Sequence, residues 1–215
     1  MKRLLALTPA LALLASPAMA HHPLGGLPME TFGHGILSGV GHPVLGFDHL
    51  AFVIVMGLAA AFTPARTVTP MAYIAAMLAG CVMVASGVGL PAKEMVIVAS
   101  LLLVGGIVAS GRAMAMTPAL VLFAGFGLFH GAAFGGSIAG QEGGVGGAVF
   151  AGYLIGLAAT QYLIALTVMA VTRFGLRATR AGATAPRLAG AAVFGIGAFL
   201  ALEFAEGPIV AALAG

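Results

Sequence analysis

The chain has 215 residues, of which 61% are hydrophobic and 7% are charged, and its formal net charge is +3. A soluble domain carries about a quarter charged residues, so this chain cannot cover its surface with polar groups, and the lipid bilayer must be its main solvent. The few, scattered basic residues argue against a nucleic acid partner. The single cysteine, Cys81, excludes an intrachain disulfide.

Residues 1–20 have the pattern of a cleavable signal peptide. Lys2 and Arg3 form its basic start, residues 4–14 form its apolar core, and the small residues of 18–20 form its cleavage site. Cleavage there would leave His21 as the new N-terminus outside the cytoplasm. The alternative is an uncleaved, short first helix.

Residues 21–215 are expected to form a single domain. They contain six apolar stretches long enough to cross a bilayer of about 30 Å, which takes about 20 helical residues. The predicted helices cover about 45–62, 69–89, 93–111, 117–137, 146–171 and 188–207. The predicted fold class is therefore an all-α membrane protein, a bundle of six transmembrane helices after a signal peptide.

Two features indicate how this bundle is built. Glycines spaced four apart within predicted helices, Gly131 with Gly135 and Gly152 with Gly156, predict close helix packing. The loops on one side of the bundle hold six arginines: Arg66, Arg112, Arg173, Arg177, Arg180 and Arg187. The loops on the other side hold only Lys93, beside Glu94. The positive-inside rule places the arginines in the cytoplasm and both ends of the mature chain outside, as the signal peptide also predicts.

All histidines and all acidic residues fall in the outer half of this predicted bundle or on its outer surface. An ionisable group inside a membrane costs about 2–3 kcal/mol and so marks a candidate functional site. The main candidates as metal ligands are His42, Asp48 and His49, at the outer end of the first predicted helix, and His130, in the outer third of the fourth. Possible accessory residues for metal binding or passage are His21, His22, His34, Glu142, Gln161 and Glu203.

The spacing within residues 42–49, HPVLGFDH, sharpens this prediction. His42 and His49 are about two helical turns apart, so they share a face if both are helical. If Pro43 starts the helix, His42 caps that same side. Asp48 points about 100° away. It is predicted either to face another neighbour or to hold the second nitrogen of a metal-binding histidine. The simpler alternatives are that an isolated histidine only bonds a neighbouring helix and that Asp48 only stabilises a helix N-terminus.

The residue types restrict the chemistry. Imidazoles with carboxylates and no nearby cysteine suit nickel, cobalt, copper or zinc, and affinity alone does not choose among them. The chain has no glycine-rich phosphate-binding loop, so ATP hydrolysis is not expected.

The sequence HPVLGFDH at 42–49 resembles the first-helix signature His-Pro-x-x-Gly-x-Asp-His of the HupE/UreJ family of nickel/cobalt permeases. FHGAAFGGSIAGQE at 129–142 resembles the second family motif, and the segments 22–43 and 151–161 are also similar to this family. The resemblance implies uptake of Ni²⁺ or Co²⁺ across the bacterial inner membrane, with both mature termini periplasmic. It implies the ion as transported substrate, no permanent cofactor, and a functional link to hydrogenase, urease or cobalamin maturation.

The second motif departs from the pattern of many members. They carry a second histidine four residues after the one that matches His130, then a glutamate three further on, where this chain has Phe134 and Ser137. In another branch the motif ends in Gly-x-Glu, which Glu142 satisfies. The missing histidine leaves open whether this member selects the same metal.

Two other functions are compatible with parts of the pattern. His49 and His130 at equal depth could be the axial ligands of a haem in an electron-transfer protein. Ser137 lies nearly two turns from His130, as an intramembrane hydrolase would need, but it lacks a Gly-x-Ser-x-Gly turn and a third group. The metal permease explains more of the polar residues, so we expect a transporter and not an enzyme.

Overall fold

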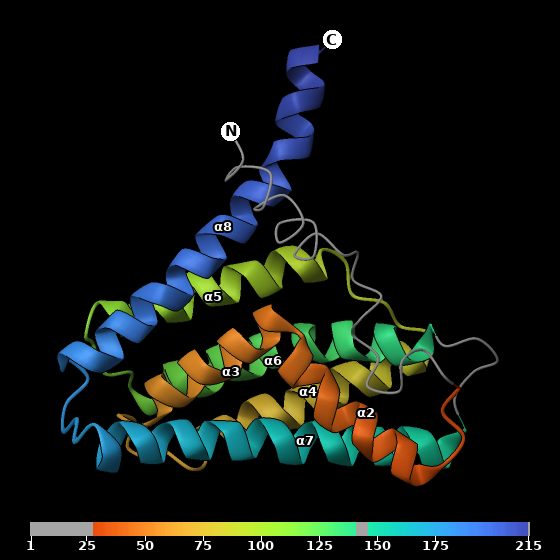
Figure 1. Cartoon of the computed structure of the whole chain (residues 1–215), viewed down its shortest axis with the longest axis horizontal. Coiled ribbons are helices and arrows are strands. Elements are labelled where there is room, and N and C mark those ends of the chain that lie inside the picture. Colours follow the sequence, from red (N-terminus) through yellow and green to blue (C-terminus); the bar gives the residue numbers. More distant parts are fainter. Residues whose placement is uncertain (1–27, 141–145, 215) are drawn as a thin grey trace, which may run out of the picture.

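The computed structural model describes residues 28–140 and 146–214, with side chains up to Glu206, and these residues form helices and no strand (Figure 1). The predicted all-α fold class is confirmed. The predicted signal peptide, His21, His22 and Glu142 lie outside the described residues.

Seven α-helices and one π-helical turn follow each other along the described chain. They are α2 (Phe32–Leu45), α3 (Phe47–Ala60), α4 (Thr69–Ala85), α5 (Lys93–Ala109), α6 (Met116–Ala139), α7 (Gly147–Ala170), η2 (Val171–Gly175) and α8 (Thr184–Ala214). From α4 onward, the helices lie close to the predicted positions, because each long apolar run is bounded by turn residues.

The first predicted helix, 45–62, corresponds to α3, but the sequence analysis did not predict the helix α2 that precedes it. The two helices are bent by 79° at a break. Pro43 lies inside α2 rather than at a helix start. Because proline lacks an N–H and disfavours helical backbone in the residue before it, it weakens the helix near this point. Gly46 has an extended backbone and ends α2, so His42 and His49 do not share one helix face as predicted.

Three helices, α6, α7 with η2, and α8, are long and apolar enough to cross a membrane, and the bent pair α2–α3 would make a fourth span if its two helices cross together. The helices α4 and α5 have 17 residues each, which corresponds to about 26 Å. Length and composition thus support a multi-pass membrane protein, while the count of six spans stays a prediction.

Close contacts through glycine hold the helices in pairs: α4 with α6, α2 with α7, and α5 with α8. A Cβ atom at Gly131 of α6 would collide with the carbonyl of Met77 on α4, and one at Gly156 of α7 would collide with the carbonyl of Ile36 on α2. The predicted close packing at both glycine pairs is confirmed, because Gly135 and Gly152 also face backbone of the neighbouring helix.

The break between α2 and α3 lies halfway along the bundle. Gly39 of α2 packs on Gly156, in the first half of α7, and Gly57 of α3 packs on Ala165, in its second half. Figure 1 shows the same course, with α2 and α3 following α7 from one end to the other. The start of α3 is therefore inside the bundle and not at its outer mouth, where the sequence had placed it.

The arginine-rich loops meet at the end of the bundle where α3 and α5 end. Arg173 Nη1 donates to the carbonyl of Ala61 at 3.1 Å, and Arg187 Nε donates to the carbonyl of Ala109 at 3.0 Å. These bonds satisfy carbonyls at two helix C-termini, which have no partner within their own helices. Glu94, at the start of α5, lies at the opposite end of that helix.

Candidate metal centre

Two of the predicted ligands meet inside the bundle. His49, in the first turn of α3, and His130, in α6, face each other with their Nδ1 atoms 2.8 Å apart. His130 is fully buried and His49 is half-buried. The break at Gly46 places His49 here, because α3 starts at mid-depth and its first turn faces α6.

Ser100 of α5 is a third member of this group that sequence reasoning missed. Its Oγ lies 3.1 Å from Nε2 of His130 and donates a hydrogen bond to the carbonyl of Ile97 at 2.6 Å. Ser100 is fully buried. A serine in an apolar run gives no sequence signal of its own, because its partner is 30 residues away and the helix pairing decides the contact.

Aromatic rings cover the histidine pair on both sides. Phe134 packs on His49 with ring centroids 4.3 Å apart, and Phe52 packs on His130 at 4.5 Å. Tyr73 contacts His130 edge-on at 5.8 Å. Apolar cover of this kind excludes water and strengthens the polar interactions that it surrounds.

His42 stands apart from the pair, in the last turn of α2. Its ring contacts Phe134 at 5.9 Å and Tyr153 at 5.8 Å, so Phe134 touches both His42 and His49. In the described part of the chain, no three His, Cys, Asp or Glu side chains lie close enough together to hold an ion. The structure thus brings together His49 and His130 of the predicted set, but not His42 or Asp48.

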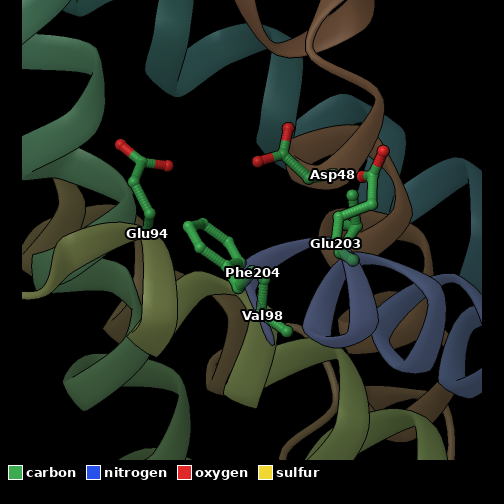
Figure 2. A pocket seen from close by; sticks show the side chains of 6 residues that line it. Asp48, Glu94, Val98, Glu203 and Phe204 are labelled. Carbon is green, nitrogen blue, oxygen red and sulfur yellow. The ribbon is translucent and has the colours of Figure 1, made fainter. Parts of the chain in front are cut away.

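Asp48 lines a separate cavity, away from the histidine pair. A pocket of about 310 Å³ is lined by Asp48, Glu94, Val98, Leu200, Glu203 and Phe204. Figure 2 shows Glu94 on one side of the ring of Phe204, Asp48 and Glu203 on the other, and Val98 below the ring. We call this cavity the acidic pocket.

Glu94 was missed as a site residue because the sequence suggests that it is neutralised by Lys93. In the structure, the amine of Lys93 lies beside Gly136 on α6, whereas Glu94 lines the acidic pocket. Asp48 and Glu94 also lie in the first turns of α3 and α5, where negative charge is stabilised by the helix dipole.

The remaining described candidates are fixed by hydrogen bonds elsewhere. Gln161 is fully buried, accepts from the hydroxyl of Tyr73 at 2.6 Å and donates to the carbonyl of Leu157 at 3.3 Å. Since Tyr73 also contacts His130, Gln161 lies one residue away from the pair. His34 caps α2: its Nδ1 accepts from the N–H of Glu30 at 3.2 Å, so its visible role is structural.

The geometry does not favour the two other functions. The direct contact between the Nδ1 atoms of His49 and His130 leaves no room for an iron porphyrin between the rings. Ser137 donates to the carbonyl of Ala133 at 3.2 Å and not to His130. The serine that does meet His130, Ser100, gives its proton to a backbone carbonyl, so the imidazole does not activate it as a nucleophile.

Comparison with known proteins identifies the family. The family model described as HupE / UreJ protein matches residues 9–200. Protein HupE of Rhizobium leguminosarum bv. viciae is 32% identical over 198 residues, which cover 90% of this chain and 96% of that protein. No solved structure was found to match. These two matches show that the chain belongs to the HupE / UreJ family.

Proposed function

We propose that this protein is a permease that takes up a divalent transition-metal ion, Ni²⁺ or Co²⁺, from the periplasm across the bacterial inner membrane. The observation that carries the proposal is the contact between Nδ1 of His49 and Nδ1 of His130 inside the bundle. The ion is the transported substrate and not a resident cofactor, and no enzymatic step is part of the proposal.

The chemistry of the two ligands supports a transition-metal ion. Imidazole nitrogens are ligands that nickel and cobalt accept, and the pair lies within the bundle, with His130 fully buried. Two protein ligands, with water completing the shell, also hold an ion weakly enough to release it.

The acidic pocket supports capture of the ion. Its carboxylates from α3, α5 and α8 concentrate cations at its mouth. The pocket and the histidine pair share two helices, because Asp48 precedes His49 on α3, and Val98 lies two residues before Ser100 on α5. Beyond the pair, the hydroxyl of Tyr73 and the amide of Gln161 are the next buried polar groups.

The arginine-rich end of the bundle supports the direction. If that end is cytoplasmic, as the positive-inside rule requires, the acidic pocket opens to the periplasm and both mature termini are periplasmic. By family membership, we propose that the imported metal serves hydrogenase, urease or cobalamin maturation.

Accumulation of radioactive nickel or cobalt in cells tests the proposal. His49→Ala and His130→Ala should abolish accumulation while the protein stays in the membrane fraction, and Asp48→Ala, which removes a carboxylate from the acidic pocket, should weaken it. Ser137→Ala is the matched control, because its hydroxyl bonds only the carbonyl of Ala133 in its own helix. Excess Ni²⁺ and Co²⁺ should compete better than Zn²⁺. Undiminished accumulation with His49→Ala would contradict the proposal.

A further inference from the structure

We propose that Ser100 is a positioning residue for the ion: it holds the proton of His130 on Nε2 and thereby keeps the lone pair of Nδ1 aimed at the site shared with His49. The inference rests on the proposed function, because it assumes that His130 binds the cation. The residues of the two family motifs do not include Ser100, and it touches neither His49 nor the acidic pocket.

The hydroxyl of Ser100 determines which nitrogen of His130 carries the hydrogen. A serine hydroxyl has one proton to donate. The short bond of 2.6 Å to the carbonyl of Ile97 uses that proton, since a carbonyl can only accept. In the contact of 3.1 Å with His130, Ser100 Oγ must therefore accept, and Nε2 of His130 must carry the hydrogen.

The hydrogen on Nε2 of His130 determines how the two imidazoles bond each other. A histidine that binds a metal is neutral and has one N–H. With its hydrogen on Nε2, His130 has a bare Nδ1, which is the atom 2.8 Å from Nδ1 of His49. Two lone pairs facing each other at this distance would repel, so without an ion, His49 carries its hydrogen on Nδ1 and donates it to His130.

Binding of an ion requires a hydrogen to move on His49 but not on His130. An ion between the two Nδ1 atoms takes the place of that hydrogen, which moves to Nε2 of His49. No hydrogen bond joins this nitrogen to a residue among 28–140 and 146–206, so it can take up the hydrogen without the loss of such a bond. His130 needs no change, because Ser100 has already selected its binding form. The hydrogen of His130 is therefore already on the nitrogen that binding needs, and only the hydrogen of His49 has to move.

Removing the hydroxyl should release His130 from this form. Without Ser100 Oγ, Nε2 has no acceptor at this position, and His130 can place its hydrogen on Nδ1, toward His49, where it blocks the ion. Loss of the group that orients a metal-binding histidine typically weakens metal affinity about 10–100-fold. Ser100→Ala should therefore raise the half-saturation concentration for nickel uptake by about this factor, with a smaller effect on the maximal rate.

The experiment compares three variants of the full chain in cells supplied with radioactive nickel. Ser100→Thr keeps a hydroxyl and should restore the half-saturation concentration that Ser100→Ala loses. Ser110→Ala is the matched control on the same helix, since Ser110 also donates to the carbonyl three residues earlier, at 2.7 Å, and is exposed. Nitrogen NMR of purified protein with labelled histidine should show Nε2–H on His130 in the unaltered chain, and a mixture in Ser100→Ala.

The outcomes separate the two proposals. If His49→Ala accumulates nickel normally, the proposed function fails. If His49→Ala abolishes uptake while Ser100→Ala keeps the original half-saturation concentration, the proposed function stands and the role of Ser100 is overturned. Equal loss in Ser100→Ala and Ser100→Thr, with an unchanged NMR signal of His130, would also overturn it, since that pattern indicates packing alone.

Discussion

Phe134 contacts both histidines of the first motif. Its ring lies 4.3 Å from that of His49 and 5.9 Å from that of His42, so it touches both histidines that the first motif supplies. It is fully buried and packs as an apolar cover over the pair. In the proposed site, Phe134 therefore occupies the space next to His49 in which a third imidazole could lie.

A third imidazole at this position should change how the ion is held. Phe134→His places a nitrogen ligand beside His49, so we expect a lower half-saturation concentration for nickel and a lower maximal uptake rate, because the ion is bound more tightly and released more slowly. Uptake kinetics in cells measure both. Phe134→Leu keeps the site apolar and is the control. Identical kinetics of the two variants would show that residue 134 does not reach the ion.

The carboxylates of the acidic pocket should act on capture rather than on the final binding step. Glu94→Gln and Glu203→Gln each remove one negative charge from the pocket, so the half-saturation concentration should rise, and the rise should shrink as ionic strength increases. Glu206→Gln is the matched control, because Glu206 is exposed on the same helix as Glu203 and does not line the pocket. An equal effect of Glu206→Gln would indicate that only total charge matters.

At the scale of the element, the packing of α4 on α6 fixes the position of His130. Gly127, Gly131 and Gly135 of α6 all face the backbone of α4, and His130 lies beside one of them in sequence. A larger residue in this row must push the two helices apart, and His130 moves with its helix.

Gly131→Val tests this coupling. The new Cβ would overlap the carbonyl of Met77, and overpacking of a well-packed interior costs about 1–3 kcal/mol or more. We expect a lower melting temperature in detergent and loss of nickel uptake. Gly125→Ala is the control on the same helix, because nothing lies within 4 Å of its added Cβ. Its stability should stay equal or rise slightly. A stable Gly131→Val with normal uptake would contradict the role of this contact.

The elements differ in how far the sequence reveals them. The helices from α4 to α8 are predictable, because apolar runs alternate with turn residues and arginines. The break before α3 is not, because residues 50–62 continue as one apolar run and Pro43 has the position of a helix-initiating proline. The residues HPVLGFDH and His130 are recognisable as a site from their cost in a membrane. That His130 meets His49 and Ser100, and that His42 does not join them, depends on the bend and on helix pairing, which local patterns do not encode.

At the scale of the whole molecule, negative and positive charges lie apart along the bundle. The acidic pocket lies beside the starts of α3 and α5, and the arginines bond the ends of these two helices. In the proposed passage, a cation attracted to this pocket meets the imidazoles, then the Tyr73–Gln161 pair, and then the positively charged end. This order gives the proposed passage a direction.

Cysteine labelling checks that direction. In a Cys81→Ala background, Gly89→Cys lies in the loop between α4 and α5, and Gly182→Cys lies in the loop before α8; both positions are exposed. A membrane-impermeant maleimide applied to spheroplasts should label the cysteine at 89, and should label the one at 182 only after permeabilisation. The reverse pattern would mean that the arginine end faces outward and that the proposed direction of uptake is wrong.

Gly46 ends α2 and also leaves space for the ring of His49. Its backbone, with φ −78° and ψ 100°, is open to any residue, so chain geometry does not demand glycine. A methyl group there would lie 2.9 Å from Cδ2 of His49, which is too close, so the ring would have to tilt away. Gly46→Ala should therefore weaken nickel uptake although it alters no polar atom, and uptake kinetics would show it. The glycine of HPVLGFDH thus leaves the space that the ring of His49 occupies.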